Sequence, residues 1–538
     1  MTENEKAPRN SRRPTRPVLG ALSGALAGFA ALAVAELVSA WVRPQAGPVV
    51  AVGGAAIDRT PAGVKDWAIR NFGTDDKLVL QLGILAVLAL FALALGILAL
   101  RHRRTGAAGV LLFGVVGAVA ATGRPDSTRP ADALPSVVGA VVGAVVLFVL
   151  AGRLVPCAPA SAPTADEETG MSPGQGWDRR GFVIAATAAA AGSAAAGALG
   201  RVLNGSRGQD AIASREDVVL PAPASAAPAV PRGAGLRIPG ISAFTTSNED
   251  FYRVDTALVV PRVDATTWRL RIHGRGVTRA LTLSFDDLLR RELVERDITL
   301  TCVSNEVGGP YIGNARWIGV RLADLLAECG VEAPSRGGAA DQLVARSVDG
   351  MTIGSPVEDV MDGRDALLAL GMNGEPLPFE HGFPVRMVVP GLYGYVSACK
   401  WIKDIELTTF DAYDPYWVRR GWSRRAPVKT QSRIDTPKPF ARPKAGTVMV
   451  GGVAWAQHRG IDKVEVRIDD GPWQEARLAA EDSRDTWRQW SFAWQATKGG
   501  HILTVRATDR TGAVQTEKRT RTLPDGASGR HSVVVTVD

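Results

Sequence analysis

The chain has 538 residues, a formal net charge of +8 and four cysteines. This length leaves room for several domains, and four cysteines are too few for a disulfide framework. The basic residues form no long run, so nucleic acid is not an expected partner. Apolar residues dominate 18–200, whereas most tryptophans, histidines and tyrosines lie in 236–538. We therefore expect a membrane region followed by a water-exposed region.

Several apolar runs have the length that a membrane-spanning helix needs, which is about 20 residues. A run at 181–199 is rich in alanine and weaker than the others. Glu36 lies inside the first run, where it marks either a quinone or partner contact or a side chain that reaches the interface. Residues 1–200 are thus predicted to hold about five transmembrane helices, the first four at 18–42, 78–100, 106–121 and 134–154.

The distribution of arginine predicts the orientation of these spans, because cytoplasmic loops carry an excess of basic residues. With five spans, the C-terminal half lies on the extracytoplasmic side of the cytoplasmic membrane. The sequence Trp-Asp-Arg-Arg-Gly-Phe-Val from Trp177 also resembles a twin-arginine export signal, and that alternative gives the same side. The arginines that we expect in the cytoplasm are Arg9, Arg12, Arg13, Arg16, Arg101, Arg103, Arg104, Arg179 and Arg180.

Three further regions follow the membrane region, and together they predict an α+β protein. Residues 201–235 are rich in proline and alanine, which predicts an extended linker. Residues 236–425 alternate short β-like and helical runs, with strands expected at 268–272, 298–302, 385–390 and 401–408 and helices at 284–291 and 320–329.

Residues 426–538 have a different pattern. Residues 463–468, 489–494 and 502–507 alternate apolar and polar residues, and Asp470-Gly471 is typical of a hairpin turn. This pattern predicts a β-sandwich of the immunoglobulin-like kind. Trp487, Trp490 and Trp494 are expected in its core.

Cys302 differs from the other cysteines because it ends a β-branched strand directly before a Gly-Gly-Pro loop. A thiol in this place is a nucleophile, a metal ligand or a small buried hydrophobic residue. Cys329 and Cys399 are expected to be packed thiols. The chain has no Cys-x-x-Cys motif and no His/Cys cluster with zinc spacing.

A second group of polar residues follows. A loop rich in Pro and Gly carries His381 and leads into a strand with Arg386, and Lys400 comes shortly after. An imidazole, a guanidinium and an ammonium group brought together would bind an anion. The alternative is a histidine in a turn with arginine on the surface.

The motifs in this region resemble those of the sulfite oxidase family of molybdopterin-dependent oxidoreductases, in a membrane-anchored bacterial form. They are Asn-Gly-x-Pro-Leu-Pro from Asn373, His-Gly-Phe-Pro-Val-Arg from His381, a Pro-Gly pair and Lys400-Trp401, all downstream of a strand-end cysteine. The resemblance covers about 240–538. It implies a mixed α/β domain for molybdenum-molybdopterin and an immunoglobulin-like dimerisation domain, hence a homodimer.

The resemblance also implies roles for individual residues. Cys302 would bind molybdenum through its sulfur, because this metal suits a soft ligand such as a thiolate. Arg253 would face the substrate and the metal, and Trp422 would lie near the metal. Arg419 and Arg420 belong to a stretch that lines the substrate channel. The cofactor-binding residues would be Arg253, Cys302, Asn305, His381, Arg386 and Lys400.

The chain departs from the family pattern at the substrate site. Sulfite oxidases read Cys-Ala-Gly-Asn-Arg-Arg, whereas this chain reads Cys-Val-Ser-Asn-Glu-Val from Cys302, so Val307 replaces an arginine and Glu306 stands beside it. Trp422 takes the place of a tyrosine. These changes remove a charge and a hydroxyl that suit a small dianion. The sequence therefore predicts a familiar metal site and an altered substrate site.

The resemblance implies oxygen-atom transfer, with a small oxyanion or an S- or N-oxide as substrate. Reduction of S- or N-oxides is the alternative within the family, and a cell-surface binding protein without cofactor is the alternative outside it. A Cys-His hydrolase is a poor option because no third orienting group is evident. The sequence shows neither Cys-x-x-Cys-His nor His-Pro-Gly-Gly. We therefore expect no haem and a separate electron-transfer partner.

Overall fold

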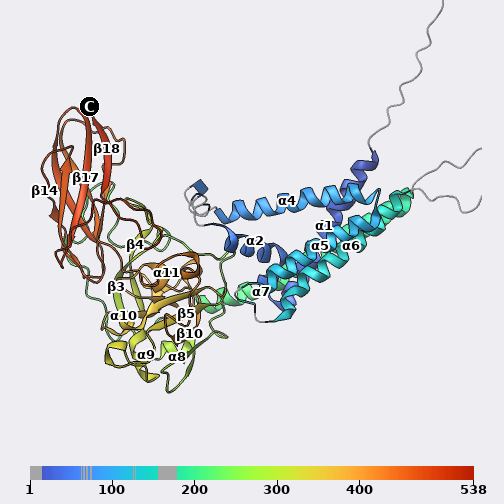
Figure 1. The fold of residues 1–538 in the computed structure, drawn as a ribbon, viewed down its shortest axis with the longest axis horizontal. Coiled ribbons are helices and arrows are strands. Elements are labelled where there is room, and N and C mark those ends of the chain that lie inside the picture. Colours follow the sequence, from blue (N-terminus) through green and yellow to red (C-terminus); the bar gives the residue numbers. More distant parts are fainter. Residues whose placement is uncertain are drawn as a thin grey trace, which may run out of the picture. The chain divides into compact units, whose positions relative to one another are not determined.

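The computed structural model describes residues 15–61, 64, 67, 71–72, 76–124, 126–127, 129–155 and 178–538. It divides into two compact units, Met1–Arg207 and Gly208–Asp538, which are described separately (Figure 1). The predicted basic residues Arg9, Arg12 and Arg13, and Trp177 of the export-like motif, lie outside the described residues.

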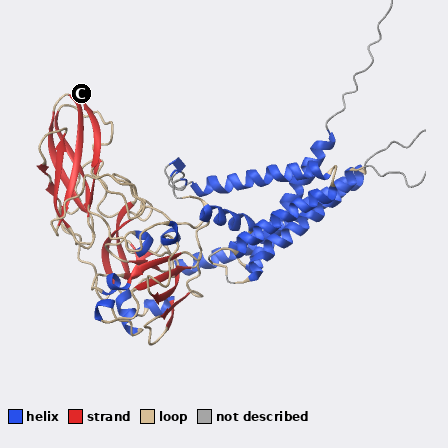
Figure 2. Ribbon diagram, viewed as in Figure 1, coloured by secondary structure: helices blue, strands red, loops and turns tan. Residues whose placement is uncertain are grey.

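The described part of the first unit is helical (Figure 2). Five of its helices are long and apolar enough to cross a membrane, and each overlaps one of the predicted spans. The short helix α2 was not predicted. The helices are α1 (Thr15–Val42), α2 (Pro48–Arg59), α4 (Asp76–Ala99), α5 (Arg103–Thr122), α6 (Leu134–Leu154) and α7 (Arg179–Glu216).

Small residues let the helices of this unit approach closely, and such residues are common where helices pack with their backbones near each other. A Cβ atom on Gly24 of α1 would lie 1.9 Å from the carbonyl oxygen of Ala92 in α4. A Cβ atom on Gly139 of α6 would lie 2.4 Å from the oxygen of Ala31. A larger side chain at either glycine would therefore push the helices apart.

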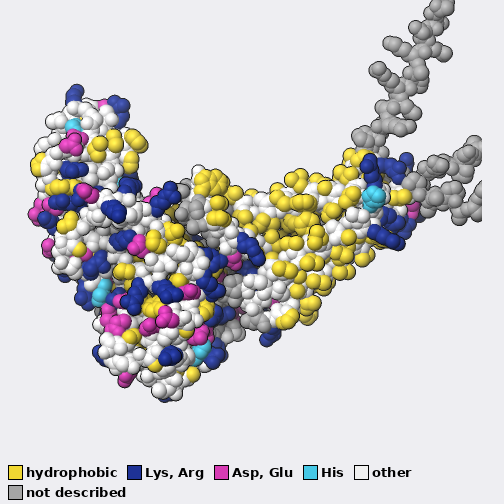
Figure 3. Space-filling view, in the orientation of Figure 1, with side chains coloured by type: hydrophobic (Ala, Val, Ile, Leu, Met, Phe, Trp, Pro, Cys, Tyr) yellow, Lys and Arg dark blue, Asp and Glu magenta, His cyan; other side chains and the backbone are white. Residues whose placement is uncertain are grey.

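Polar contacts show which helix ends share a side of this unit. At one side, Arg43 after α1 binds Asp132 and Asp126 between α5 and α6, at 2.7 and 2.5 Å. At the other, Arg16 of α1 donates to the oxygen of Leu154 at 2.7 Å. Lysine and arginine gather at one end of the helices in Figure 3, while hydrophobic side chains cover much of their visible face.

The predicted linker is only partly extended. Helix α7 continues to Glu216, so the first part of 201–235 is helical rather than extended. Tertiary contacts explain the difference, because Arg215 donates to the oxygens of Leu377 and Pro376 at 2.8 and 2.7 Å. Further on, Ser225 forms a parallel bridge with Val294, and its oxygen accepts a hydrogen bond from the N–H of Glu295 at 2.9 Å. From Gly208 onward the segment is therefore part of the second unit.

Two sheets build the mixed domain of the second unit. One has the order β2-β1-β10-β5-β6, and the other has the order β3-β4-β7-β8 with β9 paired to β7. Their strands are β1 (Arg269–Gly274), β2 (Leu281–Ser284), β3 (Val294–Thr301), β4 (Ile312–Arg321), β5 (Gln342–Ser347), β6 (Thr352–Pro356), β7 (Leu367–Met372), β8 (Glu375–Pro376), β9 (Arg386–Val388) and β10 (Ile402–Thr408).

The predicted elements of this domain are largely present. Strands β1, β3, β9 and β10 correspond to the four predicted strands, and Ser284 caps α8 (Phe285–Leu289) in a capping box. The predicted helix 320–329 is shorter, because Val320 still belongs to β4 and α9 spans Leu322–Glu328. Strand β4 was not predicted, since burial on both faces removes the polar alternation that identifies a strand.

The last part of the chain is a β-sandwich of two four-stranded sheets, with orders β11-β12-β16-β15 and β14-β13-β17-β18. Trp490 and Trp494 lie in its core as predicted, but Trp487 does not. Its ring packs in the core of the mixed domain, and its Nε1 donates to the oxygen of Phe244 at 2.8 Å. The strands are β11 (Gln431–Thr436), β12 (Gly446–Trp455), β13 (Ile461–Ile468), β14 (Gln474–Glu475), β15 (Arg477–Leu478), β16 (Arg488–Ala496), β17 (Gly499–Asp509) and β18 (His531–Val537).

Candidate functional site

Cys302 follows directly after β3, and backbone hydrogen bonds fix its position. Its N–H donates to the oxygen of Tyr311 at 3.0 Å, and its own oxygen accepts from Asn305 at 3.1 Å. The N–H of Ser304 points at the sulfur, 3.4 Å away. Cys302 is 8% exposed. The thiol is therefore held in a tight turn, with a donor on its sulfur and limited access.

Asn305 braces the loop after the thiol. Its Oδ1 accepts a hydrogen bond from the N–H of Tyr311 at 2.8 Å. Gly309 packs on this amide, because a Cβ atom there would lie 2.7 Å from Oδ1. The structure thus gives Asn305 a role in shaping the loop, and its predicted contact with the cofactor stays a prediction.

Arg386 of β9 is a buried cation. It is 5% exposed, its Nη1 donates to the oxygen of His381 at 3.1 Å, and its guanidinium lies 4.9 Å from the ring centre of Trp317. Its Nε is buried, with no hydrogen-bond partner among the described residues. Burial lowers the pKa of Arg386 to about 10, so the side chain is still charged at neutral pH. A buried guanidinium that lacks a carboxylate fits an anionic ligand.

His381 ends the short helix η5 (Phe379–His381) and lies five residues before Arg386 in the same motif. Its Nε2 lies 2.9 Å from the oxygen of Asn248, and its ring packs edge-on against Phe251. Burial and the neighbouring Arg386 lower the pKa of His381 to about 4. The imidazole is therefore neutral at physiological pH. Since the oxygen of Asn248 can only accept, Nε2 carries the proton and Nδ1 is left as an acceptor.

Arg253 and Lys400 meet on one carboxylate, that of Asp255. The Nε of Arg253 lies 3.1 Å from Asp255 Oδ2, and the Nζ of Lys400 lies 2.6 Å from the same oxygen. Lys400 also donates to the oxygen of Glu380 at 3.0 Å, next to His381. The structure thus brings these two predicted residues together with the His381 loop. Asp255 was missed, because nothing in its sequence spacing marks it.

Two tyrosines that the sequence did not single out lie within electrostatic reach of Cys302. Burial and then the charge of Cys302 raise the pKa of Tyr252. Burial raises the pKa of Tyr393 to about 12, with Asp525 and Cys302 as smaller causes. Both hydroxyls are therefore protonated at neutral pH and can donate. In the sequence, only its position directly before Arg253 could have marked Tyr252 as a site residue.

Trp422 lies in an aromatic cluster, with ring centres 5.5 Å from Tyr395 and 6.2 Å from Trp417. Its Nε1 is buried and has no acceptor among the described residues. Helix α11 (Gly394–Ser397), which carries Tyr395, reaches the end of β3, since a Cβ atom on Gly394 would lie 3.8 Å from the oxygen of Thr301. Trp422 is thus linked to the Cys302 region through α11.

Arg419 and Arg420 lie in the short helix η6 (Val418–Arg420), just before Trp422. Arg419 is exposed and donates to the hydroxyl of Tyr413 at 3.0 Å. The guanidinium of Arg420 stacks 3.5 Å from the ring centre of Tyr416. The predicted place of both arginines in a substrate channel stays a prediction.

The other possible metal-binding side chains also bear on the role of Cys302. Among the residues described, no three His, Cys, Asp or Glu side chains group to hold a metal. Cys329 and Cys399 are buried free thiols, as predicted, and burial raises the pKa of both. The predicted role of Cys302 as a metal ligand stays a prediction.

Comparison with known proteins agrees with this chemistry. Residues 257–417 match the oxidoreductase molybdopterin binding domain. The chain is 32% identical over 305 residues to mitochondrial sulfite oxidase of Homo sapiens, covering 49% of this chain and 55% of that protein. It is 33% identical over 189 residues to the oxidoreductase YuiH of Bacillus subtilis, covering 35% of this chain and 87% of that protein.

Among solved structures, the sulfane dehydrogenase SoxCD of Paracoccus pantotrophus is similar at 25% identity and a TM-score of 0.47, covering 55% of this chain and 84% of that one. The chain spans about half the length of the sulfite oxidases that it matches. It belongs to the sulfite oxidase family of molybdopterin-dependent oxidoreductases.

Proposed function

We propose that this chain is a membrane-anchored oxidoreductase that uses molybdenum-molybdopterin to transfer an oxygen atom, on the extracytoplasmic side of the membrane. One observation carries the proposal beyond family membership. Arg386 is a buried cation with no carboxylate partner among the described residues, in a motif that also holds His381. Tyr252 lies within electrostatic reach of both Arg386 and Cys302. A soft ligand and an unmatched charge suit a cofactor with a metal at one end and an anionic group at the other.

The cofactor, when bound, would supply two-electron oxygen-atom chemistry. Cys302 would hold its metal, while His381, Arg386 and Lys400 would hold the pterin and its phosphate. The neutral His381 would offer Nδ1 to a donor on the pterin, and Arg386 would offer its unpaired Nε to an anionic oxygen. Electrons would pass to or from a separate carrier.

The residues after Cys302 favour an S- or N-oxide over sulfite as the substrate. Val307 and Glu306 stand where sulfite oxidases carry arginines, so a dianion would lose a countercharge. The buried Nε1–H of Trp422 can donate a hydrogen bond to an oxygen of any of these substrates, so it does not distinguish between them.

A steady-state screen tests this function on the full-length protein from a host that makes the cofactor. Methionine sulfoxide, dimethyl sulfoxide and trimethylamine N-oxide would be tested with reduced viologen, and sulfite would be tested with ferricyanide. We expect reduction of at least one oxide to exceed sulfite oxidation. Molybdenum-loaded protein that turns over none of these compounds would contradict the proposal.

Restoring the family residues should increase sulfite use. We expect Val307→Arg combined with Trp422→Tyr to raise kcat/KM for sulfite about tenfold or more, because a charge-assisted hydrogen bond contributes about 1.5–3 kcal/mol. Val307 is half-buried, so an arginine there can reach solvent. Trp417→Tyr, in the same aromatic cluster, is the matched control and should leave sulfite use unchanged. Equal rates in all three proteins would place the substrate site elsewhere.

We also propose that α7 is a retained span rather than a removed export signal. Asn204 of α7 donates to Glu36 Oε1 of α1 at 2.7 Å and to Ser39 Oγ at 3.3 Å. A Cβ atom on Gly200 would lie 2.8 Å from the nitrogen of Leu37, so the two helices pack backbone to backbone. The intramembrane carboxylate thus has a partner that a cleaved chain would lack.

Intact mass of the protein from washed membranes tests the retention of α7. We expect one full-length species whose C-terminal region is digested when protease is added to spheroplasts. A species that begins near residue 200, or a C-terminal region protected in intact spheroplasts, would contradict retention or sidedness, respectively.

A further inference from the structure

The strand that leads to Cys302 has one edge that no strand of its own sheet covers, because β3 is at the end of the order β3-β4-β7-β8. The β-sandwich covers the end of this edge. The N–H of Thr299 donates to the oxygen of Asp485 at 2.9 Å, and the N–H of Trp487 donates to Thr299 Oγ1 at 2.8 Å. Two residues of one sandwich loop therefore hold β3 three residues before the thiol.

Gln457, on a second sandwich loop, makes the contact nearest to the thiol. Its Nε2 donates to the oxygen of Thr299 at 3.0 Å and to Thr301 Oγ1 at 2.8 Å. Thr301 is the residue immediately before Cys302, and Gln457 is 1% exposed. One amide group thus fixes the last residues of β3 before the thiol.

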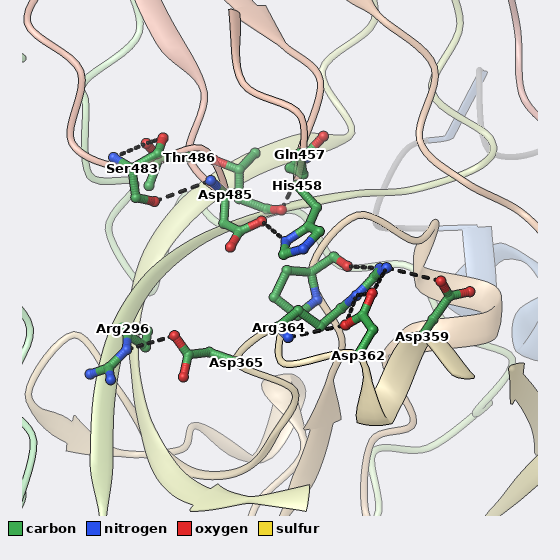
Figure 4. Close-up of polar contacts among 12 residues, drawn as sticks. Arg296, Asp359, Asp362, Arg364, Asp365, Gln457, His458, Ser483, Asp485 and Thr486 are labelled. Atoms are coloured by element: carbon green, nitrogen blue, oxygen red, sulfur yellow. Dashed lines mark hydrogen bonds and ion pairs between the residues drawn. The ribbon is translucent and has the colours of Figure 1, made fainter. Parts of the chain in front are cut away.

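The two sandwich loops also hold each other. Figure 4 shows Gln457, His458 and Asp485 together, with the imidazole of His458 directed at Asp485. The ring Nδ1 of His458 lies 3.1 Å from Asp485 Oδ1, and the backbone N–H of His458 donates to the backbone oxygen of Arg484 at 3.1 Å. His458 has φ of 66°, so this turn keeps a backbone conformation that packing must maintain.

The sandwich also holds the loop that follows Cys302. Arg433 of β11 donates from Nη1 to the oxygen of Gly309 at 2.8 Å, while its Nε binds Asp435 at 2.6 Å. The ring of His531 lies against Gly308, where an added Cβ atom would come within 2.3 Å of it. Contacts from the sandwich therefore lie on both sides of Cys302 in the sequence.

We propose that the β-sandwich sets the position of the Cys302 thiol, with Gln457 and Arg433 as positioning residues on its two sides. A metal ligand must be held to within about 0.5 Å, and the turn at Cys302 cannot achieve this if the strand before it and the loop after it are free to move. The Oε1 of Gln457 is buried without a partner among the described residues, so this amide is retained at a cost in stability. The inference rests on the proposed function only for the identity of the metal.

Thiol reactivity of the full-length protein, prepared without cofactor, tests the proposal. Gln457→Met keeps the length of the side chain and removes its donor. We expect iodoacetamide to alkylate Cys302 about tenfold faster in this variant, measured by peptide mass, while Cys329 and Cys399 stay protected. Gln495→Met, an exposed glutamine of the same sandwich, is the matched control and should not change the rate.

Two further variants keep the test decisive if Gln457→Met does not fold. Thr301→Val removes only the hydroxyl that accepts from Gln457, and Arg433→Lys keeps a cation near Asp435 while losing the bond to Gly309. Both should speed alkylation of Cys302 severalfold, and both should broaden the Mo(V) resonance of the loaded protein at unchanged metal content. A rate equal to wild type in every folded variant overturns the proposal. Because alkylation needs no cofactor, failure of the proposed function would appear separately, as absent molybdenum.

Discussion

Replacing Cys302 by serine is expected to abolish turnover, by about a thousandfold or more, while the protein stays folded. A hydroxyl is a harder and poorer ligand than a thiolate for a metal that prefers sulfur. Serine is close to cysteine in size, and its oxygen can still accept from the N–H of Ser304, which now lies 3.4 Å from the sulfur. The measurement is kcat on the best substrate, with circular dichroism to check the fold.

Cys329→Ser is the matched control for this experiment. Cys329 is a fully buried thiol in the core of the mixed domain, so the variant should lose stability without losing turnover per folded molecule. Full activity of Cys302→Ser would show that this thiol is not a metal ligand.

Replacing Arg386 by methionine should have opposite effects on the empty and the loaded protein. In the empty protein the buried cation has no carboxylate partner in the part of the chain that the structure describes, so an apolar side chain of similar length should raise stability by about 1–2 kcal/mol. In the loaded protein the same change removes a partner of the anionic group, so pterin content should fall about tenfold or more. Thermal unfolding and pterin fluorescence measure the two effects.

Arg364 provides a matched control, because its side chain is only 9% exposed but lies between two carboxylates (Figure 4). Its Nη2 is 2.9 Å from Asp359 and 2.6 Å from Asp362. Arg364→Met should therefore lower the stability of both forms, and the pterin content of the folded fraction should not change. If both arginine variants lowered the stability of the empty protein equally, Arg386 would be a structural residue.

The local parts of the site could be predicted from the sequence. A run of β-branched residues before Cys302 indicated the strand, and the motif from His381 to Arg386 indicated a loop followed by a strand. Such signals act over a few residues, so they remain valid whatever the rest of the chain does.

Long-range contacts could not be predicted in this way. Asp255 joins Lys400 across 145 residues, and Gln457 joins Thr301 across 156. Trp487 followed the alternation of a sandwich strand, yet tertiary packing places it in the neighbouring core. Composition also gave the wrong start for the linker, because contacts of Arg215 extend a helix into it.

We propose above all that Cys302 and the Arg386 motif hold a molybdenum-molybdopterin cofactor. The most direct test is the molybdenum and pterin content of the full-length protein, purified from a host that makes the cofactor. We expect close to one molybdenum and one pterin per chain in the wild-type protein, with both reduced in Arg386→Met. Wild-type protein that is folded but contains neither would contradict it.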